Sequence, residues 1–159
     1  MSVDIRPVSL LGLTQLKTLF ETALASDFDY FPASYHRAVL SQNRLRHFVR
    51  AWTKPHRLLL GVYQAGELVG YSITDCRGDE AFLFWVYLRP ELRGQGIGRQ
   101  LLAMTETACS RSGSSRLQLA THRHHDYYAH QGFTQVKVVT ESDAKVAMYI
   151  MEKPLNASV

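Results

Sequence analysis

The sequence predicts an α/β fold with a central mixed β-sheet and helices on both faces. Two observations support this class. The spacing of apolar residues switches between helical and strand periods several times along the 159-residue chain. One uninterrupted apolar stretch, Ala81 to Leu88, is typical of a central strand covered on both faces. A chain of this length suits one hydrophobic core, so residues 1–159 are expected to form a single domain.

The N-terminal part of the chain is expected to form one strand and two helices. Val3 to Val8 alternates apolar and polar residues, and Pro7 favours an edge position in the sheet. Leu10 to Leu24 has apolar residues at helical spacing. A second helix is expected from Ala33 to Trp52, because the following Lys54-Pro55 disfavours its continuation.

The remaining elements follow from the same two periods and from turn residues. Gly96 to Ser110 predicts a helix whose apolar face carries Met104 and Ala108 beside Ile97, Leu101 and Thr105. The other predicted elements are strands at Arg57–Tyr63, Leu68–Thr74, Arg116–Ala120, Phe133–Thr140 and Ala144–Glu152, and a short helix at His122–His130.

Composition narrows the class of function. Lys and Arg number 18 against 14 Asp and Glu, a net charge of +4. The basic residues are scattered, with Arg44, Arg46 and Arg50 as the only modest cluster, so no nucleic-acid partner is expected. No stretch approaches the roughly 20 apolar residues of a membrane span. The N-terminus lacks a signal-peptide layout, so a cytoplasmic protein without a membrane partner is expected.

The most informative segment is the glycine loop that precedes the predicted helix at residue 96. Gly94, Gly96 and Gly98 alternate with other residues, and Arg93 and Arg99 flank them. Glycine permits close backbone approach to a ligand, and the amides of a helix N-terminus attract anions. The spacing lacks the third glycine of a dinucleotide motif and the Gly-Lys-Ser/Thr of a triphosphate loop. The loop therefore predicts a phosphate or pyrophosphate cradle of another kind.

The stretch Leu88 to Leu102, centred on Arg93-Gly94-Gln95-Gly96-Ile97-Gly98, resembles the cofactor motif of the GNAT acyltransferases, Arg/Gln-x-x-Gly-x-Gly/Ala. A second feature of that family, a tyrosine four residues before Gly-Phe, falls on Tyr128 and Gly132-Phe133. The order of predicted elements over the whole chain also resembles the GNAT fold, in which the central strand splays away from the next one.

This resemblance implies an N-acetyltransferase that transfers the acetyl group of acetyl-CoA to a primary amine of a small molecule, peptide or protein. It implies that strand backbone lines the pantetheine arm, that loop amides hold the pyrophosphate, and that Tyr128 protonates the departing thiolate. Thr121 stands where the family often has an asparagine. The cofactor contacts implied are Val86, Tyr87, Leu88, Arg93, Gly94, Gln95, Gly96, Ile97, Gly98, Arg99, Thr121 and Tyr128.

An alkyl amine is almost fully protonated at neutral pH, so a base has to take its proton. Glu80, beside Asp79 at the start of the apolar strand, is the predicted base, although both carboxylates also suit a turn. His122 acting through a water is the alternative. The histidines from His122 to His130 lack the partner spacing of a zinc site, so no metal is expected.

The acceptor amine is expected to bind between the first two helices. Aromatic rings beside carboxylates suit a cationic amine, whereas an ordinary loop with a hydrophobic anchor is the alternative. The residues concerned are Asp27, Asp29, Tyr30, Phe31 and Tyr35. For the whole protein, a non-catalytic acyl-CoA-binding module is the competing hypothesis, and Tyr128 favours the enzyme. A monomer and a homodimer both remain open.

Overall fold

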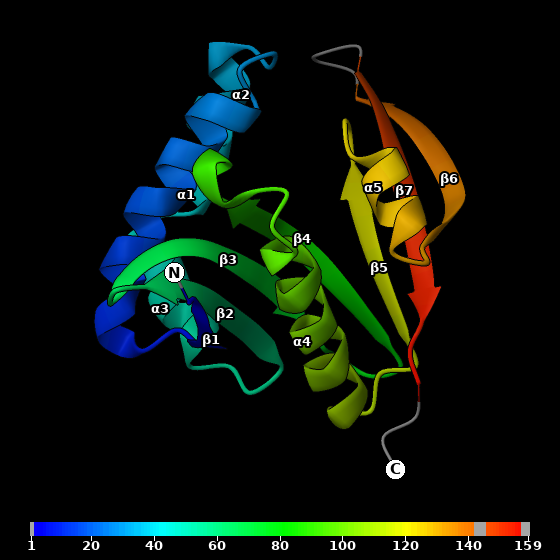
Figure 1. Cartoon of the computed structure of the whole chain (residues 1–159). Coiled ribbons are helices and arrows are strands. Elements are labelled where there is room, and N and C mark those ends of the chain that lie inside the picture. The colour runs from blue at the N-terminus through cyan, green and yellow to red at the C-terminus, as the bar shows by residue number, and fades with distance from the viewer. Residues whose placement is uncertain (1, 142–145, 157–159) are drawn as a thin grey trace.

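The computed structural model of this chain describes residues 2–141 and 146–156 (Figure 1). Within them, one seven-stranded sheet has the order β1-β2-β3-β4-β5-β7-β6. β4 and β5 pair in parallel, and the other neighbours pair antiparallel, so the predicted mixed sheet is confirmed. The strands are β1 (Asp4–Pro7), β2 (Arg57–Gln64), β3 (Glu67–Asp75), β4 (Glu80–Leu88), β5 (Arg116–Thr121), β6 (Thr134–Glu141) and β7 (Val146–Pro154).

Helices cover both faces of this sheet, as the sequence predicts (Figure 1). Adjacent residues of β2 contact different helix layers, because neighbouring side chains of a strand point to opposite faces of the sheet. Leu59 packs with α1 and α3, whereas Leu60 packs with α4. The helices are α1 (Leu13–Asp27), α2 (Ala33–Gln42), α3 (Leu45–Trp52), α4 (Ile97–Arg111) and α5 (His125–His130), with short 3-10 turns η1 (Leu10–Gly12) and η2 (Pro90–Leu92).

The helix predicted from Ala33 to Trp52 is wrong as a single element, because two helices occupy that range. α2 ends at Gln42, where the side chain of Asn43 donates a hydrogen bond to the carbonyl of Val39 (2.8 Å). α3 then begins with an extended residue, Arg44, whose N–H donates to Nδ1 of His47 (3.1 Å). Local polar contacts of this kind compete with the helical hydrogen bonds and divide the segment.

Smaller differences concern the two C-terminal helices. The predicted helix from His122 begins only at His125. On α4, Met104 is 40% exposed, whereas Leu102 and Cys109 are buried. The buried face of this helix therefore differs from the predicted one at these positions. The predicted residue Ala144 lies outside the described residues. No helix in the described part of the chain is long and apolar enough to cross a membrane.

The feature that positions the functional site is the divergence of β4 from β5. Their parallel pairing runs from Glu80↔Arg116 to Leu83↔Leu119, and the two strands then separate (Figure 1). β4 continues to Leu88, and the side chains of Phe84 and Val86 are 44% and 40% exposed there. The expectation that this apolar strand is covered on both faces is therefore wrong for its second half.

Candidate active site

A cavity of about 180 Å³ lies where β4 and β5 diverge. Side chains from both strands, from the end of α1, from α2 and from α5 line it. The sequence-predicted residues Asp27, Tyr30, Tyr35, Val86, Thr121 and Tyr128 all belong to this lining, together with Phe28, Leu83, Phe84, Trp85, Leu119, Ala120, His122, Arg123, His124 and Met148. The fold thus gathers the predicted acceptor wall, the predicted acid and part of the predicted cofactor strand around one space.

The glycine loop takes the backbone conformation that its sequence requires. Gly94 and Gly96 have φ values of +75° and +80°, a region that favours glycine. A β-carbon at either position would meet no atom within 4 Å, so the loop faces open space. Gly96 caps the N-terminus of α4, and the amide of Gln100 donates a hydrogen bond to its carbonyl (3.1 Å). The backbone amides before Gln100 belong to the first turn of the helix, where amides have no partner within the helix, so they are available to an anion.

The two arginines that flank the loop differ in their contacts. Arg93 donates from Nε to the carbonyl of Leu88 (2.8 Å) and from Nη2 to a carboxylate oxygen of Asp27 (3.0 Å). Its guanidinium therefore ties the end of β4 to the end of α1, and its positive charge is paired. Arg99 lies in the first turn of α4; burial raises the pKa of Tyr127, and the nearby charge of Arg99 opposes part of that rise.

The two neighbouring tyrosines of α5 point to different places. A β-carbon at Gly98 would lie 3.1 Å from the hydroxyl oxygen of Tyr127, so this ring sits against the start of α4. Tyr128 instead lines the cavity and packs edge-on against Phe133, with ring centroids 5.7 Å apart. Burial raises the pKa of Tyr128 well above its ordinary value, with a smaller contribution from Tyr127. Tyr128 is therefore a protonated hydrogen-bond donor at neutral pH.

The predicted acceptor residues form an aromatic wall. Phe31 is buried and stacks on Tyr35, with centroids 4.0 Å apart, and Tyr30 lies 4.7 Å from Phe31. The guanidinium of Arg123 lies 3.7 Å from the centroid of the Tyr30 ring. Asp29 is not a lining residue but pairs with this arginine across 3.7 Å. Of the two predicted carboxylates, Asp27 is therefore the one at the cavity.

The end of β5 and the loop after it contribute Thr121 and His122, which the sequence analysis named, and His124, to which it gave no role. Thr121 is buried, and its hydroxyl accepts a hydrogen bond from the amide of His124 (3.1 Å). Burial lowers the pKa of His124, which favours its neutral form. His122 lies with Nδ1 3.1 Å from the carbonyl oxygen of Ala147 on β7. This last contact joins segments that no local pattern connects.

The predicted base Glu80 lies away from this cavity. It begins β4 and forms an ion pair with Arg116 at the closed end of the strand pair. Leu83, the nearest residue of β4 that lines the cavity, is three residues further along, and a strand rises about 3.3 Å per residue, so the two are roughly 10 Å apart along the strand. Asp79 accepts hydrogen bonds from Ser115 and serves as a turn residue. The structure does not bring Glu80 together with Tyr128.

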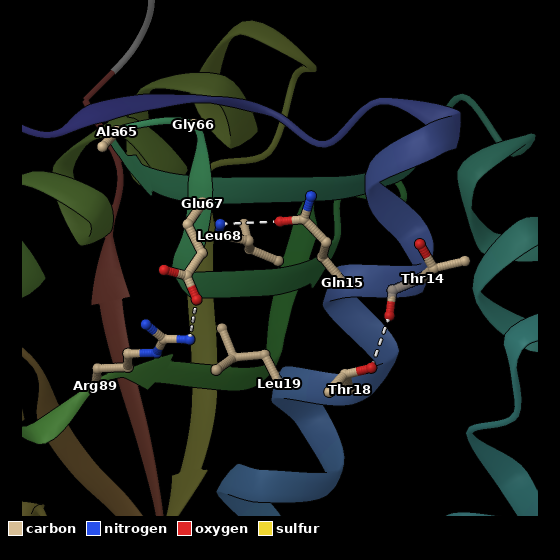
Figure 2. A pocket seen from close by; sticks show the side chains of 9 residues that line it. All are labelled: Thr14, Gln15, Thr18, Leu19, Ala65, Gly66, Glu67, Leu68 and Arg89. Carbon is tan, nitrogen blue, oxygen red and sulfur yellow. Dashed lines mark hydrogen bonds and ion pairs between the residues drawn. The ribbon is translucent and has the colours of Figure 1, made fainter.

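A second, larger cavity of about 500 Å³ lies between α1 and the turn joining β2 to β3 (Figure 2). In Figure 2, Arg89 pairs with Glu67 across 2.6 Å, and the side-chain oxygen of Gln15 accepts from the amide of Leu68 (3.0 Å). Its polar groups are thus bonded to one another, and none of the predicted site residues lines it. Among the described residues, no three His, Cys, Asp or Glu side chains are arranged to hold a metal ion.

Comparison with known proteins identifies the family. Residues 55–135, about half of the chain, match the family described as Acetyltransferase (GNAT) domain, and they include β4, the glycine loop, α4 and Tyr128. The chain belongs to the GNAT acetyltransferases. The resemblance found in the sequence is confirmed. The protein is accordingly an acyl-CoA-dependent N-acetyltransferase, and acetyl-CoA is its co-substrate.

Relatives agree with this GNAT assignment over nearly the whole chain. A spermidine N(1)-acetyltransferase of Thermoplasma acidophilum is 27% identical over 166 residues, covering 96% of this chain and 98% of that protein. The PaiA N-acetyltransferase from Thermoplasma acidophilum, solved in complex with coenzyme A, superposes with a TM-score of 0.83 at 22% identity, covering 97% and 99% of the two chains. An aminoglycoside 6'-acetyltransferase type Ii superposes at 0.76 with 15% identity, covering 98% and 99%. These structural likenesses show a common fold.

Proposed function

We propose that this enzyme acetylates a primary amine of a small molecule and that the reaction takes place in the cavity between the diverging strands. One observation carries the proposal. Tyr128, the aromatic wall at Tyr30 and Tyr35, and the exposed part of β4 line the same cavity. In this proposal the acetyl donor, the acceptor amine and the proton source meet within that one cavity.

The residues on the donor side fit acetyl-CoA. The segment of β4 beyond Leu83 has lost its neighbour on the β5 side, so its backbone is suited to an extended pantetheine arm. Gly94 and Gly96 leave open space at the N-terminus of α4, where amides and the helix dipole suit a pyrophosphate. In this proposal Val86 to Leu88 and the amides of Gly94 to Arg99 hold the co-substrate, whose thioester supplies the acetyl group.

Tyr128 is the proposed general acid. A thiol has a pKa near 8.5, so a coenzyme thiolate is a moderately good leaving group that gains from a hydrogen-bond donor. Because burial raises the pKa of Tyr128, its phenol keeps the proton until the thiolate departs. Phe133 supports the ring from one side. The phenol is suited to donating that proton at the moment of carbon–sulfur cleavage.

The acceptor side suits a compact cation. Aromatic faces at Tyr30, Tyr35 and Trp85 attract an ammonium group, and Asp27 adds a negative charge. Arg93 already pairs with Asp27, so the wall does not offer a row of free carboxylates. A monoamine or a short diamine fits this arrangement, and spermidine is an obvious compound to test, because a relative is named for it.

The test is thiol release from acetyl-CoA with a panel of alkylamines, aralkylamines, spermidine, aminoglycosides and peptides, alongside calorimetric titration of acetyl-CoA. Release with one group of small amines would support the proposal and name the acceptor class. Release with peptides alone would refute the small-molecule acceptor. Tight acetyl-CoA binding without release on any amine would favour a non-catalytic acyl-CoA-binding role.

A further inference from the structure

The imidazole of His122 is held in one orientation by a backbone group. Its Nδ1 lies 3.1 Å from the carbonyl oxygen of Ala147. A carbonyl oxygen only accepts hydrogen bonds, so Nδ1 has to carry the hydrogen. In the neutral ring the other nitrogen, Nε2, then carries the lone pair. The fold thus selects the tautomer of His122 and leaves Nε2 as a proton acceptor.

His122 lies within the acceptor wall. It follows the last residue of β5, on the far side of the cavity from β4. Its ring centroid is 5.1 Å from that of Phe31 and 6.2 Å from that of Tyr30, with edge-to-face geometry at both. Tyr128 lines the same cavity from α5. An amine bound against the aromatic wall would therefore have His122 as a neighbour.

The carboxylates near this wall are engaged elsewhere. Asp27 pairs with Arg93 and Asp29 with Arg123, while Glu80 pairs with Arg116 at the closed end of β4. Each of these carboxylates thus already has an arginine as its partner. His124 also lines the cavity, but its ring has no backbone contact equivalent to the one between His122 and Ala147 among the described residues.

We propose that Nε2 of His122 is the general base that deprotonates the acceptor ammonium, an inference that rests on the proposed acetyltransferase function. One N–H bond of the ammonium breaks as Nε2–H forms, and the freed nitrogen lone pair attacks the thioester carbonyl. Tyr128 donates its proton to the sulfur as the carbon–sulfur bond breaks, and the second proton lost by the amine nitrogen restores the phenol. The imidazolium then releases its proton to solvent.

The contact of His122 with β7 is compatible with both protonation states of the ring, because its Nδ1–H keeps the Ala147 carbonyl as partner in each. The ionisable groups that share the cavity are Tyr30, Tyr35, Asp27, Arg123, His124 and Tyr128.

The decisive variant is His122→Asn, because an asparagine amide can still donate to the Ala147 carbonyl but has no equivalent of Nε2. His130→Asn is the matched control. His130 also bonds a backbone carbonyl through Nδ1, that of Asp126 at 2.6 Å, and it is not a lining residue of the cavity. Each enzyme is assayed with the best amine of the panel and with an analogue that carries two or three fluorines on the β-carbon, whose far lower ammonium pKa leaves a large fraction neutral at neutral pH.

His122→Asn is expected to lower kcat/KM about 100-fold for the ordinary amine and only a few-fold for the fluorinated one. Its rate with the ordinary amine should rise steadily with pH, because hydroxide then replaces the missing base. Equal losses with both amines would overturn the base role and make His122 a part of the wall only. A His124→Asn variant that shows the selective loss instead would assign the role to that residue. No turnover by the unsubstituted enzyme would refute the acetyltransferase proposal itself, and this role with it.

The tautomer provides a readout that is independent of activity. Long-range proton–nitrogen NMR correlations distinguish a protonated Nδ1 from a protonated Nε2. We expect the Nδ1–H form for His122 in the free enzyme at a pH where the ring is neutral. The Nε2–H form would overturn the orientation on which the proposal depends.

Discussion

Replacing Gly96 by glutamate perturbs the proposed phosphate cradle at the residue that caps the N-terminus of α4. Gly96 has φ +80° and ψ −1°, a left-handed conformation that costs a residue with a β-carbon about 1–2 kcal/mol. No atom lies within 4 Å of the position that the β-carbon would take, so no steric clash is added. A domain of this size loses about 2–4 °C of melting temperature per kcal/mol, which predicts a fall of about 2–8 °C.

The effect on acetyl-CoA binding has a different origin. Two like charges about 4 Å apart near a protein surface repel by about 4 kcal/mol. Solvent screens this exposed position, but half of that energy already weakens binding about 30-fold. The glutamate also satisfies the α4 dipole in the free enzyme, a stabilisation of about 0.3–1 kcal/mol that competes with the phosphate. Acetyl-CoA affinity of Gly96→Glu should therefore fall at least about 30-fold.

Calorimetric titration with acetyl-CoA and thermal unfolding measure the two effects separately. Gly113→Glu is the control, because Gly113 has φ +95°, open space at its β-carbon position and a place beyond the opposite end of α4. Gly113→Glu should lose melting temperature while it keeps acetyl-CoA affinity. A folded Gly96→Glu protein that binds acetyl-CoA as tightly as the unsubstituted enzyme would refute the cradle.

Three further perturbations follow from the same geometry. Tyr128→Phe should lower kcat about 100-fold with little change in acetyl-CoA affinity. Tyr127→Phe should lower kcat much less, because Tyr127 does not line the cavity. Steady-state kinetics would contradict the acid role of Tyr128 if the larger fall in kcat were found for Tyr127→Phe. Asp27→Asn should raise KM for cationic amines about tenfold, with a smaller effect for Asp29→Asn, and equal effects would argue against a direct contact of Asp27 with the amine. Burial raises the pKa of Tyr71, so its contribution to stability is present below the ordinary pKa near 10 and is lost as the pH rises further. Tyr71→Phe should therefore reduce the loss of unfolding free energy at alkaline pH by at most about 1.4 kcal/mol per pH unit. Urea unfolding at pH 9 and pH 11 measures this difference.

Features set by neighbouring residues could be predicted from the sequence. The turn between β2 and β3 needs two positive φ values, and Ala65 and Gly66 supply +49° and +80°. The glycine loop and Tyr128 are likewise short motifs whose chemistry is carried by adjacent residues. The start of α4 at Ile97 and the closing strands followed from periodicity for the same reason. In each case the information lies within one turn of helix or one strand.

Features set by distant residues could not be predicted, and one feature set by local contacts was also missed. The division between α2 and α3 depends on side-chain bonds of Asn43 and His47, while apolar periodicity continues across the gap at Leu40 and Leu45, which both pack against the same core. Asparagine is common at helix ends, so Asn43 was the one local signal in favour of a break between the two helices. Glu80 was placed near the chemistry because it adjoins the central strand in sequence. In the structure, however, it lies where β4 pairs with β5 and is not a lining residue of the cavity.

The orientation of His122 is also set by a distant residue, because Ala147 follows it by 25 residues.

The exposure of apolar residues on β4 likewise depends on a distant segment. An unbroken apolar run predicts two covered faces only if both neighbouring strands accompany it to the end, and β5 leaves β4 after Leu83. Phe84 and Val86 then keep apolar surface that a bound acyl donor would cover, so part of the free energy of acetyl-CoA binding should come from burying it. Where β5 ends beside this opening, His122 follows it and lies edge-on to Phe31 and Tyr30 of the aromatic wall. One departure from regular pairing thus opens the donor side and positions the proposed base on the acceptor side.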